Sequence, residues 1–348
     1  MFYLKYRPQS IKELDSKSVR DQLIAILKAS NIPHAFLFTG PKGTGKTSTA
    51  RILAKVLNCE ENIKKLKTLT PSLTDKNVSA ITKGISPDVI EMDAASNRKI
   101  DDIRLLISDL KFMPLTSRYK IYIIDEVHML TKEAFNALLK SLEEPPESTV
   151  FILATTEAGK LPKTIISRCI QINFSKAKRE DIISMLDRIS TSEKIKLTHE
   201  SKTYIADSAD GSFRDAAKIL ELAVIQNDTN LDGIKKILGH SWVKGDLLDF
   251  LSKKNAVEAL KWLENSAEHG TDFKLLIESL LQSLHQQLLI KNRIEVHPQT
   301  EYNFRIKDIA RLIQLFQKAY NQLKFSPIEA LPLEIAVIEY LGEENDLN

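Results

Sequence analysis

The stretch AFLFTGPKGTGKTSTARILAKVL, residues 35–57, joins a short apolar segment to a glycine-rich loop and then to a segment with helical spacing. Its centre, GPKGTGKT (40–47), satisfies the P-loop pattern G-x-x-x-x-G-K-[ST]. A strand before the loop and a helix after it form the context in which this pattern binds nucleotide phosphates. A glycine-rich turn without a ligand is the less favoured alternative. The stretch therefore predicts a nucleotide-binding α/β domain.

The residues of this loop have distinct expected roles. Three glycines allow the backbone to wind tightly, so that its amides face phosphate oxygens at the positive end of the following helix. Lys46 can reach the β- and γ-phosphates, and the Thr47 hydroxyl is suited to coordinate Mg²⁺. The expected nucleotide-binding set from the loop is Gly40, Pro41, Lys42, Gly43, Thr44, Gly45, Lys46, Thr47 and Ser48.

Apolar segments rich in β-branched and aromatic residues recur on both sides of this stretch and are read as buried strands. Helix-period segments lie between them, and this alternation predicts a parallel sheet with helices on both faces. The expected strands are 35–40, 88–93, 120–126, 149–156 and 169–174, and the clearest helices are 47–57, 100–110 and 132–144. The polar, basic stretch 61–87 is treated as an insertion without a structural assignment.

After Phe174 the strand patterns end, and helical patterns separated by Gly, Asn or Pro continue to the end of the chain. A chain of 348 residues is longer than one hydrophobic core usually supports. We therefore expect an α/β domain over 1–175, a small helical domain over 176–241 and a second helical domain over 242–348.

Two carboxylates end the apolar strand IYII. Asp125 would hold Mg²⁺, and Glu126 would polarise an attacking water, which favours hydrolysis over phosphoryl transfer to a small molecule. The alternative is that both residues only begin the next helix, where acidic side chains favour the helix dipole. The P-loop upstream favours the catalytic interpretation because it predicts such an acidic strand end.

Three further polar residues have two open interpretations each. Thr156 ends the next strand beside Thr155, where a hydroxyl can sense the γ-phosphate or only cap the following segment. Arg168 and Arg214 lie beside segment boundaries. Each is either a surface residue or a guanidinium that stabilises charge developing on the γ-phosphate.

Composition limits the functional classes. The 49 basic and 46 acidic side chains leave a formal charge of +3, so any DNA contact must come from a local patch. Two cysteines cannot form a disulfide framework, and the N-terminal MFYLKYRPQS lacks the apolar stretch of a signal peptide. No apolar run approaches the roughly 18 residues of a membrane span. These properties favour a cytoplasmic protein without a membrane partner.

Taken together, several strings resemble the family of bacterial DNA polymerase III gamma/tau subunits. The resemblance is close from residue 1 to about 240, and beyond that only the helical composition agrees. The strings are KYRP (5–8), GPKGTGKT (40–47), DVIEMDAASNRKIDDIR (88–104), IIDEVHMLTKEAFNALLKSLEEPP (123–146), ILATTEAGKLPKTIISRC (152–169) and GSFRDA (211–216).

The resemblance implies an AAA+ ATPase that uses ATP and Mg²⁺. It implies a five-stranded AAA+ domain, a helical lid and a helical collar. Through the collar, copies of the chain would join delta and delta-prime subunits in a pentamer that loads the beta sliding clamp onto primed DNA. The resemblance implies that Lys46 and Thr47 bind phosphate and Mg²⁺ and that Asp125 and Glu126 form the Walker B pair. It implies that Thr156 is sensor 1, that Arg214 is sensor 2 and that Arg168 is the finger reaching a neighbour's ATP. It also implies that Tyr6, Arg7 and Pro8 close the adenine pocket.

His128 and Met129 are interpreted as packing and supporting residues around this site. Arg98, Lys99 and Lys111 lie where the family faces its central chamber, and they either contact DNA phosphates or form a solvated helix face.

Other classes remain as alternatives. The nearest are an archaeal-type clamp-loader small subunit and a Holliday-junction branch-migration motor, both AAA+ machines. A clamp-loader scaffold of the delta-prime kind would bind partners without hydrolysing ATP, but Lys46, Thr47, Asp125 and Glu126 are intact. A small-molecule P-loop kinase would need an acceptor site, and the helical C-terminal half offers no obvious one.

Two features depart from the family pattern. The family usually carries a four-cysteine zinc module after the first P-loop helix, whereas here only Cys59 stands in that region. A structural zinc site needs four ligands, so we expect no zinc. The sequence also ends at Asn348 without a long proline-rich extension, and it therefore resembles a minimal gamma form.

The expected absence of zinc is tested by elemental analysis of the dialysed chain. The result should be far below one zinc per chain, because a single thiolate cannot hold the metal through dialysis. About one tightly bound zinc per chain would mean that histidine or carboxylate ligands come from elsewhere in the sequence.

Overall fold

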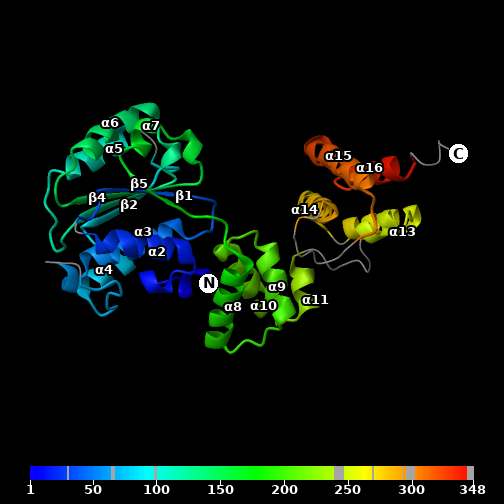
Figure 1. The fold of residues 1–348 in the computed structure, drawn as a ribbon, viewed down its shortest axis with the longest axis horizontal. Coiled ribbons are helices and arrows are strands. Elements are labelled where there is room, and N and C mark those ends of the chain that lie inside the picture. Colours follow the sequence, from blue (N-terminus) through cyan, green and yellow to red (C-terminus); the bar gives the residue numbers. More distant parts are fainter. Residues whose placement is uncertain are drawn as a thin grey trace. The chain divides into compact units, whose positions relative to one another are not determined.

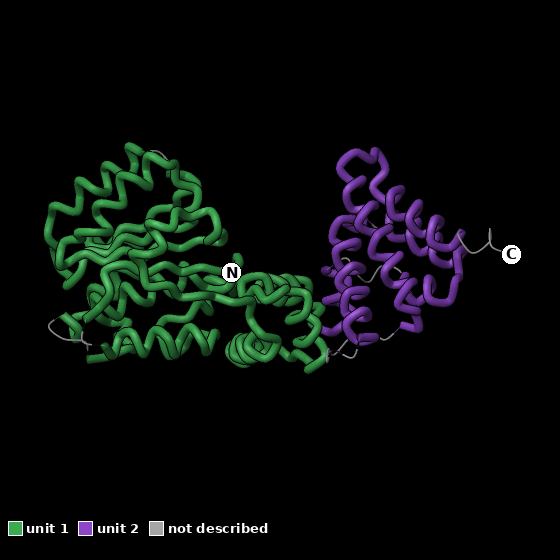
Figure 2. Tube along the Cα trace, turned by 45° about the horizontal axis from the view of Figure 1, so that its top comes forward, with its two compact units in different colours: residues 1–229 green, residues 230–348 purple. Residues whose placement is uncertain are grey.

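The computed structural model describes residues 1–29, 31–63, 67–97, 100–238, 247–268, 270–292, 294 and 302–342. The chain divides into two compact units, Met1–Thr229 and Asn230–Asn348, which are coloured separately in Figure 2. The domain boundaries expected near residues 175 and 241 stay predictions.

The first unit is built on a five-stranded parallel sheet, and this confirms the expected α/β class (Figure 1). Its strands are β1 (Ala35–Thr39), β2 (Val89–Asp93), β3 (Lys120–Asp125), β4 (Thr149–Thr155) and β5 (Ile170–Asn173). They are arranged in the order β2-β3-β4-β1-β5. Since all the strands are parallel, their carboxyl ends meet at one edge of the sheet.

The register fixes which residues meet at that edge. Thr39 of β1 pairs with Thr155 of β4 and with Asn173 of β5. Asp93 of β2 pairs with Asp125 of β3. The P-loop follows β1 directly, so the sheet places it on the same edge as the ends of β3 and β4.

Helices cover both faces of the sheet (Figure 1). Alternate residues of each strand face opposite layers: Phe36 and Phe38 belong to one buried core, and Leu37 belongs to the other. The first core includes α2 (Lys17–Lys28) and α3 (Lys46–Asn58), and the second includes α5 (Ile100–Asp109) and α6 (Lys132–Glu143). A short helix, α7 (Lys163–Ile166), lies between β4 and β5.

Helices also form the rest of the first unit. They are α8 (Arg179–Glu193), α9 (His199–Ser208) and α10 (Phe213–Ile225). Ser212 begins α10 by accepting a hydrogen bond from the amide of Asp215 at 3.2 Å. The short N-terminal helix α1 (Phe2–Lys5) packs against α10. The two ends of the unit's sequence therefore lie together.

The second unit is helical, as expected for the C-terminal part of the chain. Its helices are α11 (Leu231–Ile237), α12 (Leu247–Ser252), α13 (Ala256–Glu268), α14 (Phe273–Lys291), α15 (Ile306–Gln322) and α16 (Leu331–Gly342). Phe316 and Leu284 are fully buried where α14 and α15 pack together. In the part of the chain that the structure describes, no helix combines the length and apolar character needed to cross a bilayer.

The insertion 61–87 contains a helix, α4 (Lys76–Lys83), and a loop organised by one buried amide. Asn62 is 1% exposed, and its amide nitrogen donates to the carbonyls of Val56 at 2.6 Å and Thr68 at 2.8 Å. Its oxygen accepts from the amides of Lys67 at 2.7 Å and Thr68 at 2.9 Å. One side chain thus satisfies four backbone groups where the family usually places a metal module.

Within the described residues there is no group of three or more His, Cys, Asp or Glu side chains that could hold a metal ion. Cys59 is buried, and its thiol donates to the carbonyl of Val56 at 3.6 Å. The expectation that zinc is absent stays a prediction.

We predict that Asn62→Ala lowers the free energy of unfolding by about 3 kcal/mol, because it leaves buried backbone groups without partners. Asn97→Ala is the matched control, since Asn97 is exposed and its side-chain nitrogen donates to the carbonyl of Asp93 at 3.2 Å. It should change stability by less than about 0.5 kcal/mol. Urea unfolding of the full chain, followed by circular dichroism, measures both. Equal effects of the two changes would show that Asn62 does not organise the loop.

Candidate nucleotide-binding site

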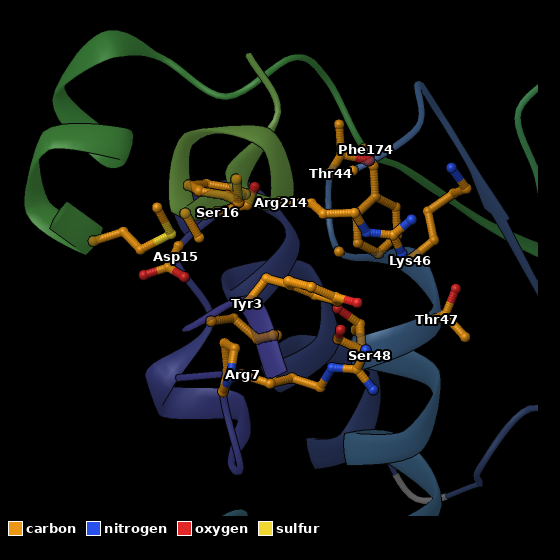
Figure 3. A pocket seen from close by; sticks show the side chains of 18 of the residues that line it. Tyr3, Arg7, Asp15, Ser16, Thr44, Lys46, Thr47, Ser48, Phe174 and Arg214 are labelled. Atoms are coloured by element: carbon orange, nitrogen blue, oxygen red, sulfur yellow. The ribbon is translucent and has the colours of Figure 1, made fainter. Parts of the chain in front are cut away.

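One pocket of the first unit collects residues from several segments that are far apart in the sequence (Figure 3). The N-terminal segment supplies Tyr6, Arg7 and Pro8, and β3 with its following turn supplies Asp125 and Glu126. Helix α8 supplies Met185 and Ile189, and helix α10 supplies Phe213, Arg214 and Ala217. The P-loop and the start of α3 supply residues 42–49. Polar groups lie on the P-loop side, whereas aromatic and aliphatic side chains form much of the rest. This division suits a molecule with a charged part and a flat apolar part.

The P-loop backbone has the conformation that its glycines were expected to permit. Gly43 and Gly45 have φ angles of 80° and 99°, in the left-handed region that favours glycine. A Cβ atom on Gly43 would lie 2.0 Å from the Ser212 hydroxyl oxygen at the start of α10. Gly45 directly precedes α3, so the free amides of the first turn of α3 face the pocket side of the loop.

Lys46 lies within this loop and is 6% exposed. Its ammonium group donates to the carbonyls of Gly40 at 2.7 Å and Pro41 at 2.8 Å. Gly40 and Pro41 do not line the pocket, and they contribute to the site by holding the Lys46 ammonium group with their carbonyls. Burial lowers the pKa of Lys46, and the nearby Arg214 lowers it further. The carboxylates of Glu126 and Asp125 have the opposite effect.

Thr47 and Asp125 meet as the sequence analysis expects. The Thr47 hydroxyl donates to Asp125 Oδ2 at 2.6 Å, and Asp125 Oδ1 accepts from the amide of Glu126 at 2.9 Å. A hydroxyl and a carboxylate oxygen beside a phosphate-binding loop are the ligands that Mg²⁺ takes from proteins. The donor set therefore fits Mg²⁺.

Glu126 has a strained backbone and a side chain held by hydrogen bonds. Its φ of 47° lies in the left-handed region, which costs an ordinary residue about 1–2 kcal/mol. Its Oε2 atom accepts from the Thr156 amide at 3.2 Å and from the Thr156 hydroxyl at 3.0 Å. Thr156 is not among the lining residues, and its expected role as sensor 1 stays a prediction.

The pocket wall opposite the P-loop comes from the N-terminal segment, which is fastened to α8. The Tyr6 hydroxyl and the Lys5 ammonium both donate to Glu193 Oε1 at 2.7 Å. Arg188 of α8 contacts Asp15 with both terminal nitrogens, at 2.8 and 3.2 Å. Phe2, Tyr3, Asp15 and Phe213 also line the pocket. These four residues are not predictable from the sequence, because no local pattern marks them.

The two arginines proposed for the site lie in different places. Arg214 of α10 lines the pocket. Arg168 does not line it: its guanidinium pairs with Glu143 of α6 and donates to the carbonyl of Thr164 at 2.7 Å. Of the residues considered for DNA, Lys111 is exposed after α5, whereas Arg98 and Lys99 lie outside the described residues.

Comparison with known proteins finds relatives over most of the chain. A family model described as DNA polymerase III, delta subunit, matches residues 16–178. DNA polymerase III subunit tau of Bacillus subtilis is 36% identical over 97% of this chain and 62% of its own length. Subunit gamma of Buchnera aphidicola subsp. Schizaphis graminum is 33% identical over 97% of both chains. Subunit tau of Escherichia coli is 33% identical over 97% of this chain and 54% of its own.

The chain thus spans less than two thirds of these tau relatives and nearly all of the gamma relative. Among solved structures, the Thermotoga maritima RuvB Holliday junction branch migration motor aligns with a TM-score of 0.49 and 19% identity, covering 74% of this chain and 80% of that chain. That likeness is too distant to bear on function.

The parallel sheet, the P-loop, the acidic end of β3 and the helices that follow define a P-loop nucleotide-binding fold of the AAA+ class. More narrowly, the chain belongs to the DNA polymerase III gamma/tau family.

Proposed function

We propose that this chain is the ATP-hydrolysing motor subunit of a DNA polymerase III clamp loader, which places a ring-shaped sliding clamp on primed DNA. One observation carries the proposal: Lys46, Thr47 and the acidic pair at the end of β3 line one pocket, in a chain that aligns with a gamma subunit over 97% of both lengths. A scaffold that does not hydrolyse ATP has no need for this complete set.

The geometry supports a simple division of labour. The triphosphate of ATP would lie along the P-loop amides, with Lys46 exchanging its carbonyl contacts for β- and γ-phosphate oxygens. Thr47 and Asp125 would hold Mg²⁺, which supplies positive charge to the phosphate oxygens. Glu126 would accept the proton of the water that attacks the γ-phosphorus, while the bond to the β–γ bridging oxygen breaks and ADP leaves.

Five further residues and the Arg168 guanidinium complete this proposal. Tyr6, Arg7 and Pro8 would close the adenine side of the pocket, and Arg214 would contact the γ-phosphate of its own chain. Thr156 would serve as sensor 1 by orienting Glu126, to which it already donates two hydrogen bonds. Arg168 would act on the ATP of a neighbouring subunit, since it lies off the wall of its own pocket.

The proposed partners are delta and delta-prime subunits, other copies of this chain, the beta sliding clamp and primed DNA. Helices of the second unit would form the collar that joins the subunits. Exposed apolar side chains on and beside α16, such as Ile338 at 54% and Phe325 at 88%, support a surface used for association.

The most direct test of the proposed clamp-loader function is whether primed DNA together with the clamp stimulates ATP hydrolysis by the chain.

We predict that Lys46→Ala abolishes ATP binding, whereas Glu126→Gln binds ATP but hydrolyses it at least about 100-fold more slowly. The difference arises because Glu126→Gln keeps the Mg²⁺ ligands and removes only the carboxylate that polarises water. Glu144→Gln, at the exposed end of α6, is the control and should hydrolyse ATP like the unmodified chain. Nucleotide titration and steady-state turnover measure the two effects. Undiminished turnover in Glu126→Gln would remove Glu126 from the mechanism.

We predict that Arg168→Ala leaves ATP binding nearly unchanged and lowers stimulated turnover by about 10³-fold or more, the usual contribution of an arginine finger. Assembling Arg168→Ala chains with Lys46→Ala chains should restore part of the activity, because some interfaces then pair an intact loop with an intact finger. A co-assembled mixture no more active than either variant alone would contradict action between subunits.

A further inference from the structure

His128 has a polar environment that a packing role does not require. It lies in the single turn Val127–Met129 that follows Glu126, and its side chain is 6% exposed. Nδ1 lies 3.0 Å from the hydroxyl oxygen of Thr155 and 3.4 Å from Oε2 of Glu126. Nε2 lies 3.3 Å from Oε1 of Glu157. The ring therefore bridges the end of β4 and the carboxylate that would polarise water.

The chemistry of these neighbours determines which ring atom carries a proton. A carboxylate only accepts hydrogen bonds, so Nδ1 attracts Glu126 only when Nδ1 carries a hydrogen. The Thr155 oxygen already accepts from the Glu157 amide at 3.0 Å and has a second lone pair for the same Nδ1–H group. A lone pair on Nδ1 would instead repel Oε2. Nε2 faces the Glu157 carboxylate in the same way, so both contacts are favourable together when each ring nitrogen carries a hydrogen, with Nδ1–H bonded to Thr155 and facing Glu126.

The Glu126 carboxylate is then held from two directions. Thr156 donates to Oε2 from the backbone that follows β4, and His128 approaches the same oxygen from the turn after β3. Thr155 is fully buried in the central sheet, so it gives His128 a rigid anchor. Because the Glu126 backbone is itself strained, its side chain needs such restraints to stay in one orientation.

We propose that His128 is a positioning residue for Glu126: its Nδ1–H group, anchored by Thr155, orients the carboxylate for the attack of water on ATP. ATP hydrolysis depends on this contact, while ATP binding does not. The inference rests on the proposed role of Glu126 in hydrolysis.

Two substitutions separate the ring nitrogens. Asn places an amide nitrogen near the position of Nδ1, and Gln reaches toward the position of Nε2. His128→Asn therefore keeps a donor for Thr155 and Glu126, whereas His128→Gln keeps one for Glu157. His128→Ala removes both. Thr155→Val keeps the shape of the anchor without its oxygen, and Glu157→Gln is the matched control at the Nε2 side.

The test measures kcat and ATP affinity of each full-length variant in the assembly in which the unmodified chain is active. His128→Ala, His128→Gln and Thr155→Val should lower kcat about 10-fold or more, with ATP affinity within about 2-fold. His128→Asn should recover most of the loss, and Glu157→Gln should stay within about 2-fold of the unmodified chain. Thr155→Val keeps the test decisive where a change at His128 prevents folding.

A spectroscopic readout complements turnover. Two-bond ¹H–¹⁵N spectra of histidine rings, with His128 assigned by its loss in His128→Asn, should show a hydrogen on Nδ1. Glu126→Gln should shift this Nδ1 resonance, because it replaces the carboxylate that the group faces. An unprotonated Nδ1, or a resonance that Glu126→Gln leaves in place, would overturn the proposal.

The kinetic outcomes also distinguish two failures. If Glu126→Gln abolishes turnover while His128→Ala or Thr155→Val leaves kcat unchanged, only the positioning role is wrong. The positioning role is also wrong if His128→Asn and His128→Gln restore kcat equally, because side-chain volume alone would then explain the result. If Glu126→Gln itself hydrolyses ATP normally, the proposed role of Glu126 fails, and the inference about His128 fails with it.

Discussion

The hydrogen bond from Thr47 to Asp125, 2.6 Å long, depends on the whole order of the sheet. Thr47 follows β1 and Asp125 ends β3, and these strands lie on either side of β4, about 10 Å apart. Helix α3 packs over β3 and β4 after leaving β1, so its first turn carries Thr47 across that distance to Asp125. A different strand order would separate the phosphate loop from its acidic partner, although each sequence motif would be unchanged.

Around that contact, the pocket concentrates positive charge in a partly buried place. Burial lowers the pKa of Arg7, and the neighbouring Arg51 and Arg214 lower it further. Burial also lowers the pKa of Lys46, with Arg214 adding to the shift against the effects of Glu126 and Asp125. Each shift reports that a cation is held where its charge is unfavourable. A polyphosphate relieves this cost, so ligand binding and stability of the first unit are coupled.

The sequence predicts those features that depend on neighbouring residues. Alternating strand and helix patterns give the five strands, and the P-loop and the acidic end of β3 follow from local motifs. It does not predict that Thr156 contacts Glu126 or that Tyr6 contacts Glu193, because both pairs form only when distant segments pack. Nor does the sequence predict the contacts of Asn62, because a buried amide with four backbone partners has no spacing that marks it.

The two sides of the pocket are held by contacts of different strength. The phosphate side rests on buried strands and on Lys46, Thr47 and Asp125, so moving it would disrupt the core of the unit. The opposite wall is fastened by Lys5–Glu193 and Arg188–Asp15 pairs that remain partly open to solvent. Such pairs contribute little, typically about 0–1 kcal/mol each, and are weakened by salt. The contacts that fasten the N-terminal segment are therefore easier to break than those that hold the P-loop side of the pocket.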